Sequence, residues 1–305
     1  MAKHNNVTLY GYVPELPVIV KDDKTNEYIR GIFTAVVVRG IRDFGNNIDR
    51  IKYDAVRVMS FNPEIIKTIE TLKVHDMVEV KGSFTTRDVI KTVFCDECNT
   101  KISTPGSLAY INPIYMSKRE TGKSTEDCVK LLKKRYEISN QATLIGIVCR
   151  EPEFFRTTKG VVITTYQLAV FRKYRVRNDA VDDIVDFPWV KSYGKIAISD
   201  YKALKKGSFV FLDGIVQARD VERKSTCPEC GAIRVWNELV EEIIPYAVEY
   251  LRDFNSKEDV LKLEAEGVKA IKRTIFNESD IERSYDDIDL DVDKLAEEEN
   301  NSLYE

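Results

Sequence analysis

Four of the six cysteines in this chain of 305 residues stand in two pairs with the same spacing, Cys95-x-x-Cys98 and Cys227-x-x-Cys230. A CxxC pair presents two thiolates to a tetrahedral zinc ion, and a structural zinc site needs four such ligands. The two pairs could therefore meet within one chain or between two chains. A pair could instead be vestigial, redox-active or reduced without a metal. We expect a structural Zn²⁺ with all four cysteines as ligands, shared between the pairs or between chains.

The cysteine pairs belong to a repeat with a period of about 132 residues. Residues 82–98 recur without a gap as residues 214–230, sharing the first glycine, an Arg-Asp-Val tripeptide and the CxxC pair. Nearer the start of each copy the offset drifts to 135, where residues 9–13 match residues 144–148. Solenoid repeats are only about 20 to 50 residues long. A period this long therefore predicts two tandem domains.

The apolar pattern predicts the same elements in each copy. Stretches rich in Val, Ile, Phe and Tyr are typical of strands, and they occur at residues 6–13, 31–39, 52–60, 77–84, 141–149, 161–172, 186–198 and 208–216. Residues 62–72 have helical spacing between the third and fourth strands. A Ser-x-x-Asp cap at Ser124 and again at Ser256 predicts a helix after each set of strands. This order of strands and helix is that of the OB-fold, a five-stranded partly open barrel.

We therefore expect a mainly β protein with two tandem OB-fold barrels. The first barrel is assigned to residues 1–120, a linker helix to 121–140, the second barrel to 141–250, a further helix to 251–276 and an acidic tail to 277–305. The chain length and its 43% of apolar residues suffice for about two domain cores.

The charge is divided unevenly along the chain. Residues 246–305 contain 8 Lys/Arg and 18 Asp/Glu, a net charge of −10, whereas residues 1–245 contain 38 and 32, a net charge of +6. A block of like charge with few large apolar residues cannot offset its ordering entropy. We expect the tail to be disordered and to bind partners; the alternative is a solvated tail that only aids solubility.

Nothing in the sequence predicts a membrane protein. No stretch approaches the roughly 18 uninterrupted apolar residues of a membrane helix, and the first residues lack the apolar region of a signal peptide. Paired cysteines fit a reducing compartment, where they bind metal better than they form disulfides. We expect a cytoplasmic protein without a membrane partner.

Several motifs of the second copy resemble bacterial and phage single-stranded DNA-binding proteins. They are Gly146-Ile-Val-Cys-Arg-Glu-Pro-Glu-Phe, Tyr166-Gln-Leu-Ala-Val-Phe-Arg172, Asp186-Phe, and Leu204-Lys-Lys-Gly followed by a strand that ends at Gly214. The resemblance covers about residues 141–225 and, more weakly, 6–95. It implies single strands held by base stacking on aromatic rings and by phosphate contacts from Lys and Arg.

The resemblance also implies which residues contact the nucleic acid. By motif position the stacking rings are Phe33 and Phe61 in the first copy and Tyr166 and Tyr193 in the second, with arginines at Arg39, Arg87, Arg172 and Arg219. Each ring could instead be an ordinary core aromatic, and Phe187 and Trp189 are then the alternative stacking residues. The basic stretch Lys173, Tyr174, Arg175 and Arg177 is expected to contact nucleic acid or to be a solvated loop.

The chain has only two histidines, His4 and His75, and neither stands near a cysteine pair or a carboxylate cluster in a catalytic pattern. Its regularly spaced acidic residues are not clustered as two-metal nucleases require. We therefore expect a protein without enzymatic activity that binds and protects single-stranded DNA, without base preference, in replication, recombination or repair. Its tail would recruit replication and recombination proteins, and the resemblance suggests a homodimer with four barrels. The alternative is an OB-fold RNA-binding protein or assembly module.

Overall fold

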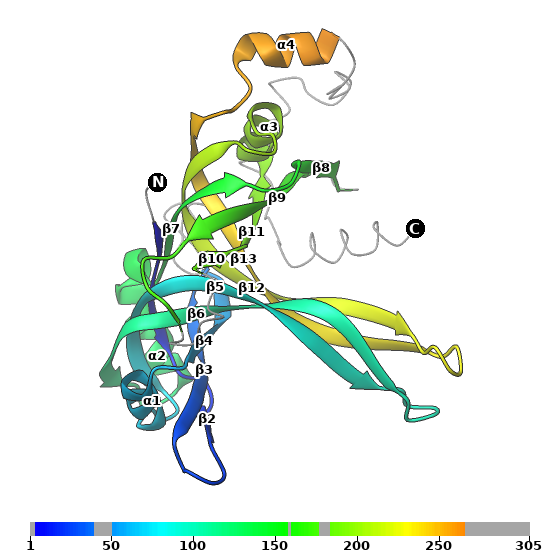
Figure 1. The fold of residues 1–305 in the computed structure, drawn as a ribbon. Coiled ribbons are helices and arrows are strands. Elements are labelled where there is room, and N and C mark those ends of the chain that lie inside the picture. Colours follow the sequence, from blue (N-terminus) through cyan, green and yellow to red (C-terminus); the bar gives the residue numbers. More distant parts are fainter. Residues whose placement is uncertain (1–3, 40–50, 158–159, 177–183, 266–305) are drawn as a thin grey trace.

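The computed structural model describes residues 4–39, 51–157, 160–176 and 184–265. Strands make up most of this part of the chain, as predicted (Figure 1). The acidic tail at 277–305, the end of the helix predicted at 251–276, and Arg177 lie outside the described residues.

The first barrel is a closed ring of five strands. Its elements are β1 (Asn5–Tyr12), β2 (Val18–Lys21), β3 (Tyr28–Val38), β4 (Tyr53–Ser60), α1 (Pro63–Glu70), β5 (Asp76–Phe94) and β6 (Lys101–Thr121). The ring runs β1-β3-β4-β6-β5 and returns to β1. It is antiparallel except where β4 meets β6, at Val58 and Ile111. The short β2 pairs only with β3.

The second copy repeats this topology. Its elements are β7 (Asn140–Val148), β8 (Glu153–Arg156), β9 (Val162–Phe171), β10 (Val185–Asp186), β11 (Trp189–Tyr193), α3 (Gly194–Ala203), β12 (Phe209–Thr226) and β13 (Ile233–Arg252). The ring runs β7-β9-β11-β13-β12 and returns to β7, and its parallel contact joins Val190 to Ile243. Both rings have the strand order of an OB-fold, so the predicted fold class is confirmed.

Helices follow the barrels where the caps predicted them. In α2 (Thr125–Lys134) the Ser124 hydroxyl accepts a hydrogen bond from the Asp127 amide. In α4 (Lys257–Ala265) the Ser256 hydroxyl accepts one from the Asp259 amide. The described helices include none that is long and apolar enough to cross a bilayer.

One predicted strand, residues 186–198, is wrong in its second half. The chain leaves the sheet after Tyr193 and forms α3, the counterpart of α1. Ala197 and Asp200 are buried three residues apart, which is the spacing of a helix face and not of a strand. The short apolar run Ile-Ala-Ile at residues 196–198 is compatible with both a strand and a helix, so the sequence did not distinguish them.

The two barrels pack together through β1 and β7, which pair antiparallel from Asn5–Leu144 to Leu9–Asn140. Asn5 exchanges two hydrogen bonds of 2.8 Å with the backbone of Phe84, and Asn140 bonds the backbone of Val216 in the same way. These amides satisfy backbone groups at equivalent places in both copies. One hydrophobic core runs through both barrels as a result.

Two long hairpins project side by side from the barrels (Figure 1). We call residues 86–109 of β5 and β6 the first arm, and residues 218–241 of β12 and β13 the second arm. Pairing continues to Phe94–Lys101 in the first arm and to Thr226–Ile233 in the second. The strands are thus much longer than the 77–84 and 208–216 predicted. Glu238 links the arms by an ion pair to Lys91 of the first arm, and it also lies 3.3 Å from Arg223 of its own arm.

Candidate nucleic-acid interface and metal centre

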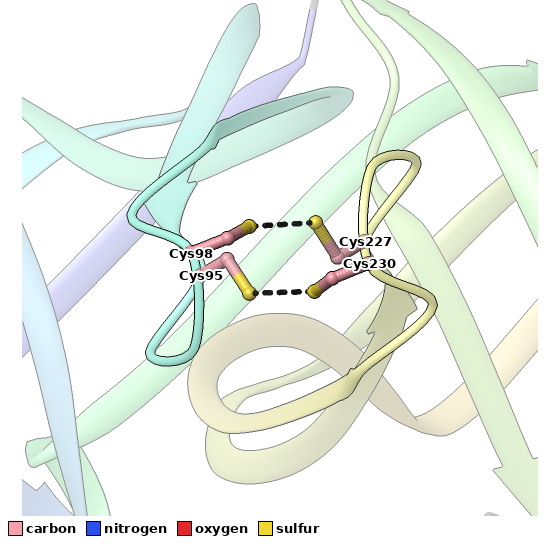
Figure 2. A group of neighbouring side chains, drawn as sticks. All are labelled: Cys95, Cys98, Cys227 and Cys230. Carbon is pink, nitrogen blue, oxygen red and sulfur yellow. Dashed lines mark hydrogen bonds between the residues drawn. The ribbon is translucent and has the colours of Figure 1, made fainter.

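The four paired cysteines come together at the tips of the two arms (Figure 2). Cys95 Sγ lies 3.6 Å from Cys230 Sγ, and Cys98 Sγ lies 3.5 Å from Cys227 Sγ. All four sulfurs lie within 4.8 Å of one another, and none forms a disulfide. Of the arrangements that the sequence left open, the structure shows the two pairs of one chain meeting each other.

Both tips have the same backbone conformation. The Cys95 carbonyl accepts from the amide of Asn99, as the Cys227 carbonyl does from Gly231, at 2.9 and 3.0 Å. Asn99 and Gly231 have positive φ values of 56° and 75°, which Asn and Gly tolerate best. These turns aim both thiols of each pair to one side. The first cysteine of each pair is buried beside Ile102, and the second is exposed.

The geometry fits a tetrahedral metal ion. Zn–S bonds of about 2.3 Å place the sulfurs of a regular tetrahedron about 3.8 Å apart, close to the 3.6 and 3.5 Å between the sulfurs of Cys95 and Cys230 and of Cys98 and Cys227. A cysteine binds a metal ion as the thiolate and not as the thiol. The hydroxyl and backbone of Thr100 lower the pKa of the Cys98 thiol to about 6, with Thr100 Oγ1 3.2 Å from Cys98 Sγ, whereas hydrogen bonds with Cys98 and Cys95 raise the pKa of the Cys230 thiol. The four cysteines together could therefore hold one metal ion.

Two rings predicted to stack on bases, Phe33 and Tyr166, lie instead in the barrel cores. Phe33 is 3% exposed and Tyr166 is fully buried. The Tyr166 hydroxyl lies 3.3 Å from Asp200 Oδ2. The prediction is wrong for both residues, because neither offers a ring face to a base. Phe61 and Tyr193 are half-buried, and their predicted role stays open.

Arg39 and Arg172 also have another role than the predicted one. Arg39 Nη2 lies 2.7 Å from Asp54, and Arg172 Nε lies 2.7 Å from Asp186, at equivalent places in the two copies. The Arg172 side chain is only 4% exposed. These ion pairs give both guanidinium groups a structural role, and their predicted phosphate contacts stay a prediction. Arg219 is similarly engaged, with Nε 2.9 Å from Glu242.

The other predicted residues are accessible on the second barrel and first arm. Lys173, Tyr174, Arg175, Phe187, Trp189 and Arg87 are all exposed. Trp189 pairs with Gln167 on β9, the Gln167 amide donates to the Phe187 carbonyl, and β9 leads into the basic stretch after Phe171. We call Arg150, Lys173, Tyr174, Arg175, Phe187 and Trp189 the basic–aromatic surface.

Sequence reasoning missed Arg150 as a member of this surface. Its guanidinium lies 5.6 Å from the centre of the Trp189 ring, within the range of a cation–π contact. Arg150 belongs to the motif that begins at Gly146, and the sequence assigned it no contact with nucleic acid. The contact joins β11 to the turn that follows β7, and no spacing in the sequence reveals it.

A buried carboxyl group in the second barrel couples stability to pH. Asp200 lies 2.8 Å from the Tyr250 hydroxyl, and burial raises its pKa to about 6. The pKa of Asp200 in the folded protein exceeds its value of about 3.9 in the unfolded chain. Asp200 therefore contributes to the free energy of unfolding fully below about pH 4, and this contribution is lost as pH rises through 6. Burial raises the pKa of Glu241 to about 7, which acts in the same direction.

We expect the free energy of unfolding to fall between pH 5 and pH 8, with about 1 kcal/mol of the loss due to Asp200. Urea unfolding of the wild type and of Asp200→Asn at both pH values measures this, and the variant should show the smaller fall. An equal fall in both proteins would contradict the assignment to Asp200.

Two closed five-stranded barrels, with a basic–aromatic surface on the second, place this chain among the OB-fold binding proteins. A model of the Single-strand binding protein family matches residues 139–230. The chain is 31% identical over 119 residues to Single-stranded DNA-binding protein 1 of Staphylococcus aureus, a match that covers 39% of this chain and 69% of that protein. The chain belongs to the single-strand binding protein family.

Two further comparisons agree with this assignment. Single-stranded DNA-binding protein 3 of Listeria innocua is 35% identical over 83 residues, which cover 27% of this chain and 51% of that protein. The crystal structure of the wild-type single-stranded DNA binding protein from Thermus aquaticus superposes with a TM-score of 0.53 over 83% of this chain and 95% of that one. Its sequence identity is 15%, so this likeness concerns the fold.

Proposed function

We propose that this protein binds single-stranded DNA without base preference and protects exposed strands during replication, recombination or repair, with no catalytic step. The observation that carries the proposal is the basic–aromatic surface: Tyr174, Phe187 and Trp189 are 58%, 45% and 38% exposed, and the Arg150 guanidinium lies over the Trp189 ring. Membership of the family and the names of its relatives support it.

The surface fits a two-step mechanism. Lys and Arg side chains attract the phosphate backbone, and the strand displaces its condensed counterions as it binds. Bases then stack on the exposed rings, at roughly 1–3 kcal/mol per well-placed base. Every base has a ring face, so the binding needs no particular sequence.

The experiment is a fluorescence-anisotropy titration of labelled oligo-dT, RNA of the same length and duplex DNA, at low and high salt. We expect tight, salt-sensitive binding with a preference for oligo-dT. Replacing Lys173 and Arg175 together by Glu should weaken binding about tenfold and reduce the salt slope by about two. Lys24→Glu, an exposed lysine of the first barrel's β2–β3 turn, is the control and should bind as wild type does.

The other outcomes distinguish the alternatives. Equal affinity for RNA would favour an RNA-binding protein, because OB-folds stack both nucleic acids in the same way. No binding at any salt concentration would favour an assembly module and refute the proposal.

We also propose that the four-cysteine cluster holds one structural Zn²⁺ per chain. Four sulfur ligands with tetrahedral spacing suit zinc better than a hard cation such as Mg²⁺ or Ca²⁺, which prefers oxygen ligands. Such an ion would tie the two arms together at their tips. Four unpaired thiols also support a reducing location, the cytoplasm.

The acidic tail at 277–305 is proposed to compete with DNA for the basic–aromatic surface and to recruit replication and recombination proteins. The division between a net charge of −10 after residue 245 and +6 before it supports this. A chain ending at residue 276 should then bind oligo-dT more tightly, with a changed salt slope. Unchanged affinity and slope would refute the proposal.

The repeat and the family resemblance support two further proposals about organisation. The first is that the two copies are two domains joined by the linker of residues 121–140, which contains α2. The second is a homodimer that presents four barrels. Sedimentation of the DNA-free protein would show twice the chain mass, and a monomer at all concentrations would refute the dimer.

A further inference from the structure

The strand pairs that close the two barrels show which residues are equivalent. Val58 meets Ile111 in the first barrel as Val190 meets Ile243 in the second, which fixes an offset of 132 between β4 and β11. Trp189 therefore corresponds to Arg57.

Strand pairs also show which residues are equivalent in the turn after the first strand of each barrel. Tyr12 pairs with Val36 as Ile147 pairs with Ala169, and Val18 pairs with Ile32 as Glu153 pairs with Thr165. The offset is 135 on both sides of the turn between these strands. Within this turn Arg150 corresponds to Glu15, so the two barrels carry opposite charges at this position.

The equivalent places have different chemistry. In the second barrel the Arg150 guanidinium lies over the ring of Trp189, whose cross-strand neighbour is Gln167. A cation over an indole ring restrains the ring, and Trp189 remains 38% exposed. This barrel offers a base an anchored aromatic ring beside a positive charge.

In the first barrel the same place has no aromatic ring on which a base could stack. The exposed carboxylate of Glu15 accepts a hydrogen bond of 3.4 Å from Thr34, the cross-strand neighbour of Arg57. The Arg57 guanidinium lies 3.7 Å from Glu241 of the second copy. The exposed carboxylate of Glu15 repels phosphate at this place.

We propose that Arg150 and Trp189 form a nucleobase-stacking subsite that only the second barrel possesses. The inference rests on the proposed function and deepens it: the two barrels are unequal, and a single strand engages the second barrel first. Arg150 fixes the ring and attracts the adjoining phosphate, while Glu15 disfavours the strand at the corresponding place.

The test compares matched variants in oligo-dT titrations. Trp189→Ala should weaken binding about tenfold, the usual effect of losing one stacked base. Arg150→Glu, which copies the first barrel, should weaken it at least as much. Trp189→Phe should keep most of the affinity, which separates loss of the ring from misfolding. Glu15→Ala is the matched control in the first barrel and should bind as tightly as wild type or slightly more tightly.

Intrinsic fluorescence gives a second readout. The chain has two tryptophans, Trp189 and Trp236, so Trp236→Phe leaves Trp189 as the sole indole emitter. Its emission should be quenched when oligo-dT is added. If the wild type binds oligo-dT but Trp189→Ala and Arg150→Glu bind equally well and Trp189 is not quenched, the subsite is overturned and the proposed function stands. If the wild type does not bind oligo-dT, the proposed function itself fails.

Discussion

Replacing Asp186 by alanine will lower the free energy of unfolding by about 3–5 kcal/mol, the usual cost of removing one partner of a buried ion pair. Asp186 is fully buried, and its carboxylate lies 2.7 Å from Arg172, which is 4% exposed. It also accepts hydrogen bonds from the Asn5 side chain at 3.1 Å and from the Thr86 amide at 2.9 Å. The alanine variant leaves a buried guanidinium without this carboxylate, removes the acceptor of the Thr86 amide and removes one of the two acceptors of the Asn5 side chain.

Urea unfolding followed by circular dichroism at pH 7 measures this effect. Asp220→Ala is the control, because Asp220 is an exposed aspartate of the second arm, and such surface changes alter stability by about 0.5 kcal/mol or less. Asp54→Ala should cost less than Asp186→Ala, since the Arg39 side chain is 11% exposed and turns more readily to water. Equal stability of Asp186→Ala and Asp220→Ala would contradict the structural role of this ion pair.

The fold was predictable from the sequence because both copies have the same residues at structurally constrained positions. Gly82 and Gly214 are examples: a Cβ at either would lie 2.2 Å from a carbonyl oxygen of the neighbouring strand. Each marks a register shift in its barrel, after Lys81 and after Asp213. Only glycine allows this approach, so these positions identify the same bend in each copy.

The interface was less predictable because a motif position does not say which way a side chain points. Tyr166 lies with Leu168 and Val170 on the inward face of β9, so period-two patterning alone would have assigned it to the core. Arg172 follows the same strand and meets its carboxylate only after Asp186 is brought back by β10. The contact of Arg150 with Trp189 likewise depends on three-dimensional packing.

The cysteine centre shows the same division between what was predictable and what was not. The CxxC spacing predicted four cysteine ligands but left open whether the two pairs meet within one chain. Whether the tips meet depends on how β1 and β7 join the barrels, because that junction decides whether the arms run side by side. The antiparallel pairing of β1 with β7 places both arms on one side of the molecule (Figure 1).

Changing Cys95 to serine will abolish tight zinc binding and free the arms from each other. We expect one zinc per chain in the wild type by elemental analysis and less than about a tenth of that in the variant, since three ligands do not close a structural site. Cys149→Ser, a half-buried thiol outside the cluster, is the control and should keep its zinc. A wild-type protein that takes up no zinc, or a variant that keeps it, would refute the metal centre.

Hydrogen exchange will show where the metal acts. Without it, the arms are held together near their ends by ion pairs such as Arg234–Asp96, in which Asp96 is 80% exposed, and pairs of this kind contribute about 0–1 kcal/mol. Zinc bound to such sites contributes about 10–16 kcal/mol in small peptides. Because a two-stranded ribbon is marginally stable by itself, amides of both arms should exchange much faster in Cys95→Ser. Amides of the barrels, whose core is closed without the arms, should exchange as in the wild type.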